Sequence, residues 1–329
     1  MKKLLRDILF MQSFGIILVV LGHSFFQFSH HFIVLRWIYG FHMPMFFFIS
    51  GYLLRYAHGN LKGMRLVGHG GYLTRRAHRL LLPYVVLSTL VFIPKTLMSN
   101  YTVRVVHLNW HEYLYQLLYP YHNVLAAFWF MPTLFLTFAV FIIGCMLAHK
   151  VCGRLTRCHT GMGVLVLLAL LNCLIPFSHD SLFNCVGVAF YMFHFTLGYL
   201  FQASPLETAV KNANPLMLFV ATLTMSVVLL YVPQNSFVDL LTALNGTLMT
   251  MALALLYERH NCHLLDHLYG YTYTIYLFSN FFQIICLQLA LHFVSLPPAV
   301  FVPMSFLTGL YGPVAMRKVW RKMKSQKSA

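Results

Sequence analysis

The sequence contains few charged residues and very few acidic ones. Asp and Glu number 7 against 23 Lys and Arg, and charged residues make up 9% of the 329 positions while hydrophobic residues make up 59%. A soluble domain of this length could not cover its surface with so little charge. The formal net charge of +16 would suggest nucleic-acid binding in a soluble protein. Here the basic residues separate long apolar runs, which indicates membrane topology and no nucleic-acid partner.

Several sequence signatures are also missing. The seven cysteines form no Cys-x-x-Cys pair and most lie inside apolar runs, which argues against a disulfide framework. The chain has no Gly-x-Ser-x-Gly elbow, no P-loop and no dinucleotide fingerprint. Residues 1–28 begin with basic residues and continue into an apolar stretch, as a signal peptide does, but they lack a small-x-small cleavage site. We therefore interpret this segment as a retained first span.

Long apolar runs are the main positive feature of the chain. Backbone groups in hydrocarbon must be satisfied within their own segment, so runs of roughly 17 to 25 apolar residues predict transmembrane helices. The predicted spans are residues 8–28, 37–55, 80–99, 124–148, 161–178, 182–202, 215–232, 237–257, 270–292 and 296–317. The predicted fold is an all-α polytopic membrane bundle of about ten transmembrane helices. We predict a single transmembrane domain over residues 1–329, with a short basic tail at 318–329.

The connections between these runs alternate in charge. One alternate set carries twenty of the basic residues: Lys2, Lys3, Arg6, Arg55, Lys62, Arg65, Arg75, Arg76, Arg79, Lys150, Arg154, Arg157, Lys211, Arg259, Arg317, Lys318, Arg321, Lys322, Lys324 and Lys327. The other set carries only Arg36, Lys95 and Arg104. Basic loops stay in the cytoplasm, so this alternation predicts that both termini are cytoplasmic.

Three side chains are predicted to lie at one depth beneath the outer surface. His23 is about five residues, or roughly 8 Å, from the outer end of the first predicted span. His42 and Trp129 occupy matching positions in the second and fourth predicted spans. Ionisable groups at this depth face a cavity or a partner.

Each of these residues allows a structural and a functional interpretation. His23 is either bonded to a neighbouring helix or placed in the interface, or it is a general base that takes a proton from an acceptor hydroxyl near neutral pH. His42, two residues before Pro44, is structural or positions substrate. Trp129 packs in the bundle or belongs to the aromatic belt.

A second cluster precedes the third predicted span. Arg76 and Arg79 fall on one helix face at i, i+3, in a segment that also contains Arg75. Such clusters are topology signals or lipid-headgroup anchors, or they bind anions. A guanidinium is a planar donor fork suited to phosphate, so coenzyme A is a candidate ligand.

Histidines gather once more in segment 260–267. His263 and His267 have the i, i+4 spacing of a metal pair on a helix. The segment lacks a complete metal-binding signature, so we predict no metal site.

Four segments together resemble a known family. They are residues 14–24 (FGIILVVLGHS), 41–53 (FHMPMFFFISGYL), 76–84 (RAHRLLLPY) and 128–132 (FWFMP). In this order they are similar to the opening half of the integral-membrane acyltransferase family three, which includes polysaccharide and peptidoglycan O-acetylases. The resemblance is dense over residues 6–135 and rests beyond that on the ten-span layout and on Gly198-Tyr199-Leu200.

The resemblance implies transfer of an acyl group, commonly acetyl from cytoplasmic acetyl-CoA, to a hydroxyl of a cell-surface or exported carbohydrate or glycolipid. The expected location is the inner membrane of a bacterium, in contact with lipid. His23 matches the family's essential histidine, and Arg76 and Arg79 match its Arg-x-x-Arg pair. The family usually has Lys or Arg eleven residues before that histidine, where this chain has Gln12. A second departure is Ser279-Asn280, where many relatives have a histidine.

The residues and the resemblance fit one mechanistic hypothesis. Coenzyme A binds Arg76 and Arg79 as a substrate rather than a permanent cofactor, and His23 activates the acceptor hydroxyl. Tyr52, His42, Trp129 or Gln12 could stabilise the oxyanion or bind substrate. Two alternatives remain. One is a transporter or flippase for a carbohydrate or lipid-linked substrate, although the chain shows no repeated halves. The other is an inactive scaffold, which Gln12 keeps open.

Overall fold

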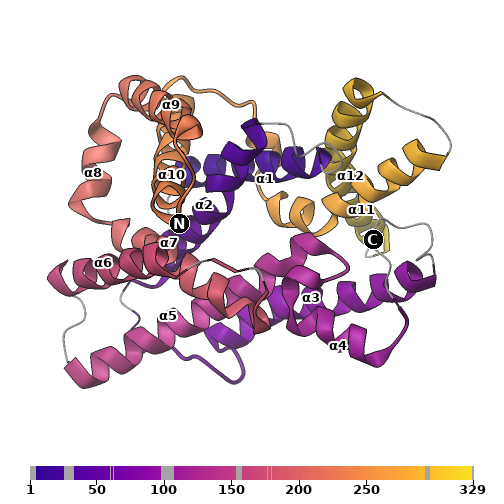
Figure 1. Ribbon diagram of the computed structural model, residues 1–329, viewed down its shortest axis with the longest axis horizontal. Helices are drawn as coiled ribbons and strands as arrows, with labels where there is room; N and C mark the ends of the chain where they lie inside the picture. The colour runs from indigo at the N-terminus through magenta and orange to yellow at the C-terminus, as the bar shows by residue number, and fades with distance from the viewer. Residues whose placement is uncertain are drawn as a thin grey trace. The chain divides into compact units, whose positions relative to one another are not determined.

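The computed structural model describes residues 5–25, 33–59, 61, 63–97, 107–152, 158–175, 177–178, 180–292 and 297–327. Within these ranges the chain forms twelve α-helices and four short 3₁₀ helices, with no β-strand (Figure 1). Helix is the structure expected for apolar segments whose backbone groups must bond internally. The prediction of an all-α class is therefore confirmed.

The helices belong to two compact units. We call residues Met1–Phe46 with Pro205–Ala329 the split unit, and Phe47–Ser204 the central unit. Helix α2 (Ile33–His58) contributes its first part to the split unit and its second part to the central unit. Pro44 lies inside α2, and the helix continues past it. The predicted single domain stays a prediction.

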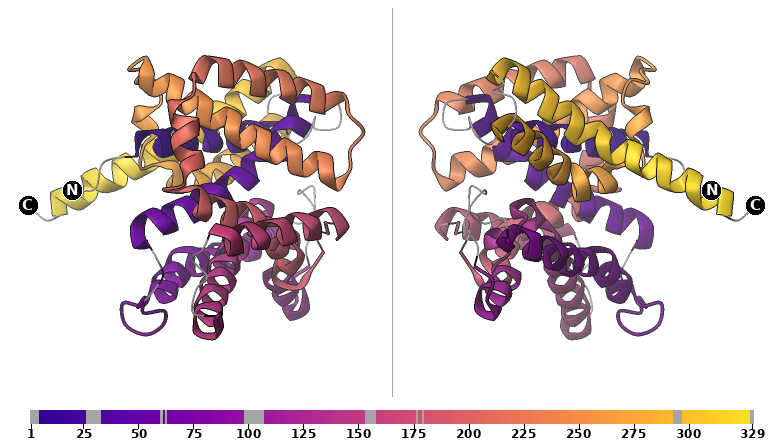
Figure 2. Two further views of the ribbon diagram at one scale, coloured as in Figure 1. Left: turned by 90° about the vertical axis from the view of Figure 1, so that its left-hand side faces the viewer. Right: turned by 90° about the vertical axis from the view of Figure 1, so that its right-hand side faces the viewer.

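The split unit is built around helix α1. Its other helices are α8 (Pro205–Asn212), α9 (Pro215–Tyr231), α10 (Ser236–Arg259), α11 (Thr272–His292) and α12 (Pro298–Lys327). Helix α1 (Arg6–Ser24) packs against α10, α11 and α12, and α11 lies along α12 (Figure 2). Gly246 of α10 allows close packing, because a Cβ there would overlap the Phe41 side chain.

The central unit packs its helices around α5 and α7. It contains α3 (Tyr72–Leu97), α4 (Trp110–Leu118), α5 (Phe130–Cys152), α6 (Cys158–Leu174), α7 (Cys185–Phe201), η3 (Pro120–His122), η4 (Ala126–Trp129) and η5 (Leu182–Asn184). Helix α5 contacts α3 and α7, and α6 packs on α7. The connection before the fourth predicted span contains α4, whose start is capped by Asn109.

Each of the ten predicted spans corresponds to a helix. Eight helices in the described ranges are long and apolar enough to cross a membrane. Helices α8 and α9 form one further apolar pair, bent by 101°, and α6 supplies a shorter apolar helix over Gly161–Leu174. The polytopic membrane fold is thus confirmed, while the cytoplasmic location of the termini remains a prediction.

Candidate functional site

The split unit carries the two histidines predicted near the reaction centre. His23 lies in the last turn of α1 and is half-buried. The last residues of the predicted first span, beyond Phe25, lie outside the described ranges. His42 is buried in α2, and its Nδ1 donates a hydrogen bond to the Ile38 carbonyl at 2.7 Å. A carbonyl only accepts, so neutral His42 keeps its Nε2 lone pair as an acceptor.

Tyr39 links the surroundings of the two histidines. Its ring lies against Gly22, where an added Cβ would be 3.1 Å from the ring, and it packs on the His42 ring at 5.6 Å between centroids. Gly22 precedes His23 in the chain, so the Tyr39 ring contacts both the α1 turn that carries His23 and the His42 ring. The structure therefore brings this predicted pair together.

Gln283 of α11 fixes the turn of α1 that carries His23. Its Nε2 donates to the Val20 carbonyl at 2.9 Å and to the Ser24 hydroxyl oxygen at 2.9 Å. Gln283 is buried, and among the described residues its Oε1 has no hydrogen-bond partner. These bonds hold residues on both sides of His23, so Gln283 limits movement of the α1 turn that carries it. The sequence did not single out Gln283, although an amide inside an apolar run is a signal for an interhelical hydrogen bond.

Gln12 lies on the same face of α1 as His23. Eleven residues make three turns, which separates the two by about 16 Å along the helix. The nearest basic residue, Arg6, donates to Asp266 at 3.3 Å and to the Cys262 carbonyl at 2.8 Å. Arg6 is thus held at the start of α1 and does not replace the charge missing at Gln12.

The Arg6 contacts form a polar cluster at the start of α1. Burial acts to raise the pKa of Asp266, but hydrogen bonds from His263, Tyr257 and Tyr269 outweigh it, together with the Arg6 charge, so the net pKa lies below its usual range. His263 Nδ1 lies 2.7 Å from Asp266. Within the described ranges, no group of three or more His, Cys, Asp or Glu is arranged to hold a metal ion.

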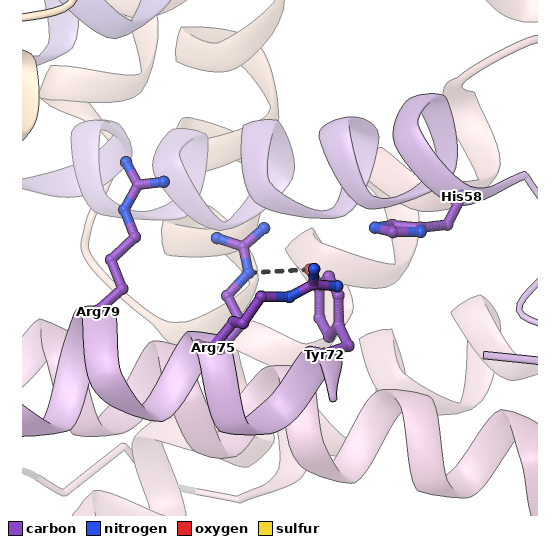
Figure 3. Close-up of a pocket in the computed structure, with 5 residues that line it drawn as sticks. His58, Tyr72, Arg75 and Arg79 are labelled. Atoms are coloured by element: carbon purple, nitrogen blue, oxygen red, sulfur yellow. Dashed lines mark hydrogen bonds between the residues drawn. The ribbon is translucent and has the colours of Figure 1, made fainter. Parts of the chain in front are cut away.

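The central unit carries a cavity that contains both predicted arginines. The cavity has a volume of about 340 Å³ and is lined by His58, Tyr72, Arg75, Arg76 and Arg79. Figure 3 shows that Tyr72, Arg75 and Arg79 rise from one helix and that His58 comes from another. None of the five lining residues is acidic, so the cavity is electropositive and suited to an anion.

Arg76 is held in place by two aromatic residues, Tyr72 and Phe138. Its Nε donates to the Tyr72 hydroxyl at 3.0 Å, and its guanidinium lies 5.1 Å from the Tyr72 ring centroid and 4.4 Å from that of Phe138. Because Nε bonds to Tyr72, the two Nη groups are the donors that can form hydrogen bonds to a phosphate. Arg75 and Arg79 are exposed. The sequence pointed to Arg76 and Arg79 but not to His58 and Tyr72. The position of His58 depends on how α2 lies relative to α3, whereas Tyr72 lies one turn before Arg76 on α3 itself.

Trp129 and Tyr52 also belong to the central unit. Trp129 ends η4 and stacks between Tyr121 and Tyr191, with centroid distances of 4.8 and 5.6 Å. Tyr52 is buried in the second part of α2. The structure thus groups His23 with His42, and Arg76 with Arg79. The predicted common layer of His23, His42 and Trp129 involves both units and stays a prediction.

Comparison with known proteins identifies one family. A family model described as an acyltransferase domain matches residues 6–318. No curated protein and no solved structure shows significant similarity to the chain. The matched region includes the α1 histidine and the arginine cavity, which therefore both lie within the family's shared domain.

Proposed function

Because the chain belongs to the acyltransferase family whose model spans residues 6–318, we propose that it moves an acyl group from cytoplasmic acyl-CoA to a carbohydrate hydroxyl. Membership of this family identifies the protein as a membrane acyltransferase. The finer assignment is acetyl transfer from acetyl-CoA to a cell-surface or exported carbohydrate or glycolipid, at the inner membrane of a bacterium. The rival carrier function gains no support from an acyltransferase family.

The arginine cavity is the observation that carries the donor assignment. Coenzyme A has three phosphate groups, and the cavity offers three guanidinium groups with no acidic residue in its lining. Arg76 is held by Tyr72 before any ligand arrives, which reduces the entropy lost when a phosphate binds. In this proposal Arg76 and Arg79 bind the donor phosphates, and Arg75 and His58 are further lining groups.

His23 is the proposed general base. Its imidazole takes the proton from the acceptor hydroxyl, whose oxygen attacks the thioester carbonyl carbon. The resulting tetrahedral oxyanion collapses, the carbon–sulfur bond breaks, and the thiolate of coenzyme A receives the proton from the imidazolium. Charge on the oxyanion needs nearby hydrogen-bond donors, for which Tyr52 and Trp129 are the candidates from the sequence. Gln12 is about 16 Å from His23 along α1 and is therefore too far away to be one. Neutral His42 presents an acceptor nitrogen, so it suits orientation of the acceptor hydroxyl better than stabilisation of an oxyanion.

The proposal is tested with the purified protein in phosphatidylcholine nanodiscs, radiolabelled acetyl-CoA and a glycan panel. Wild type should form acetylated glycan, and His23→Gln should form none while giving the same elution profile and melting temperature. Transfer by His23→Gln at the wild-type rate would remove the base assignment. Glycan flux into vesicles without any acetylated product would instead favour a carrier.

The donor site has its own variants. Arg76→Ala should raise KM for acetyl-CoA about tenfold, with a smaller change in KM for the glycan, because a charge-assisted hydrogen bond to phosphate is lost. Arg65→Ala is the matched control, since it removes one positive charge from the segment before the same helix but outside the cavity lining. Equal donor KM values for Arg76→Ala and Arg65→Ala would refute the phosphate site.

A further inference from the structure

The central unit displays a group of stacked aromatic rings that the donor site does not use. We define the aromatic cluster as Tyr115, Tyr119, Tyr121, His122 and Trp129, all half-buried. The Tyr115 and Tyr119 rings stack at 4.6 Å with 25° between their planes, and Tyr121 stacks on Trp129 at 4.8 Å and 13°. His122 lies 5.2 Å from Tyr115.

The cluster is anchored in the core of the unit. Trp129 stacks on buried Tyr191, which in turn stacks on buried Phe47 at 4.2 Å with 4° between the planes. Four rings from four elements therefore form one continuous column. Such a column fixes the orientation of its half-buried end, Tyr121, without flexible side chains.

Buried polar groups hold the backbone of the same segment. Asn123 Nδ2 donates to Ser88 at 2.9 Å, and the Gln116 side-chain oxygen accepts from the Val124 amide at 3.1 Å. Ser88, Gln116 and Asn123 are each at most 3% exposed. Lys95 Nζ also donates to the Val124 carbonyl at 2.9 Å. A connection between spans is usually mobile, so a buried network of this kind indicates a surface that must keep its shape.

The cluster and the arginine cavity lie at different levels along helix α3. The cavity uses Tyr72 to Arg79 in the first turns of α3. The segment that carries the cluster bonds to α3 from Tyr84 to Lys95. At 1.5 Å per residue this range begins about 12 Å and ends about 28 Å beyond Arg76. By the charge pattern, the cavity is at the cytoplasmic end of α3 and the cluster faces the outer half.

A hydrogen-bonded histidine–aspartate pair flanks the rings. His122 Nε2 donates to the Asp180 carboxylate at 3.2 Å, and the two side chains are 33% and 66% exposed. The Asp180 carboxylate keeps a second oxygen that can accept from sugar hydroxyls. Flat aromatic faces beside exposed hydrogen-bonding groups match the chemistry of a sugar, whose ring has an apolar C–H face and a rim of hydroxyls.

We propose that the aromatic cluster, with Asp180, is a carbohydrate subsite that binds a sugar ring of the acceptor. This inference rests on the proposed function for the reaction itself, but binding can be measured without transfer. A membrane-interface belt requires neither a four-ring column nor the His122–Asp180 pair, so these features favour sugar over lipid headgroup.

The test is saturation-transfer NMR on the full-length protein in phosphatidylcholine nanodiscs, without donor. The probes are cellohexaose, chitohexaose and maltohexaose. Wild type should transfer saturation to the ring C–H protons of at least one of them, and Tyr119→Leu should weaken its Kd about tenfold through loss of a stacking face. Tyr119→Phe should retain binding. Tyr231→Leu, which changes a tyrosine 79% exposed on α9, is the matched control.

Each outcome decides the proposal. No saturation transfer from any probe, or equal Kd values for Tyr119→Leu and Tyr231→Leu, overturns the subsite. Competition of the signal by soluble phosphocholine but not by free monosaccharide identifies a headgroup site and also overturns it. Failure of the proposed function is distinguishable, because sugar binding at the cluster without acetyl transfer leaves the subsite standing. Conversely, if Tyr119→Leu transfers acetyl groups with an unchanged KM for the glycan, the acyltransferase function stands and the subsite is refuted.

Discussion

At the scale of single residues, Tyr72 orients Arg76 in the proposed donor site. Its hydroxyl accepts from Arg76 Nε at 3.0 Å, and its ring lies under the guanidinium. Tyr72→Phe keeps the ring and removes the hydrogen bond, which is worth about 1 kcal/mol, so KM for acetyl-CoA should rise about fivefold with little change in kcat. Steady-state kinetics with the donor varied measure this split.

The control for Tyr72 lies in the other unit. Tyr271 is also covered by a guanidinium, that of Arg317 at 5.3 Å, but it does not line the cavity. Tyr271→Phe should leave the donor KM unchanged. If Tyr72→Phe also leaves it unchanged, or lowers kcat alone, Tyr72 is not a positioning residue for the phosphate site.

The sequence could name some of the site residues and not others, for a physical reason. Arg76 and Arg79 stand out because charge is costly near hydrocarbon, and His23 stands out because an imidazole inside an apolar run needs a partner or a role. Tyr72 and Gln283 act through hydrogen bonds to residues 4 and 263 positions away. In the sequence, Tyr72 resembles any tyrosine at a membrane interface. The role of Gln283 depends on how α11 packs against α1.

At the scale of elements, two glycines allow α2 and α7 to cross closely in the central unit. A Cβ on Gly51 would overlap the Phe195 carbonyl, and one on Gly198 would overlap the Phe48 carbonyl. Backbone atoms cannot move aside as a flexible side chain can, so Gly198→Ala should force the helices apart. We expect the melting temperature of the detergent-solubilised protein to fall by more than ~5 °C. Fluorescence-detected size exclusion after heating measures this change.

Gly144 gives the matched substitution for this crossing. It lies in α5 with open space where a Cβ would be placed, so Gly144→Ala should be neutral or slightly stabilising through helix propensity. A Gly198→Ala protein that melts no lower than Gly144→Ala would contradict the close crossing. Sequence alone did not identify Gly51 and Gly198 as a pair, because a helix that is apolar on all sides does not reveal which face packs.

The existence of the helices was far easier to predict than their packing. Each predicted span coincides with a helix because lipid leaves an apolar segment no other way to satisfy its backbone. The 101° bend between α8 and α9 was not predicted, since Pro205–Asn212 is short and carries Glu207 and Lys211. These two residues form an ion pair at 2.8 Å, and Lys211 also pairs with Asp7 at 3.1 Å. The Lys211–Asp7 ion pair thus ties the bent pair to α1 by charge.

At the scale of the whole molecule, the chain divides its predicted reaction between two units. The proposed base, His23, belongs to the split unit, and the proposed donor site belongs to the central unit. The order of motifs along the sequence gave no sign of this division, because His23 and the cavity arginines all lie in the first quarter of the chain. Only α2 among the described helices contributes residues to both units. Helix α2 carries both His42, a member of the histidine pair, and His58, which lines the arginine cavity.

The charge pattern makes a testable prediction about orientation. Moving a Lys or Arg across the bilayer is costly, and twenty of the 23 basic residues lie in one alternate set of connections. A green fluorescent protein fused after residue 327 should therefore fluoresce in a bacterial host. Alkaline phosphatase inserted at residue 234, between α9 and α10, should be active, because that connection belongs to the sparsely charged set. An inactive phosphatase at 234 combined with an active one after 327 would invert the topology. The arginine cavity would then open away from the cytoplasmic pool of acyl-CoA, and the donor assignment would fall with it.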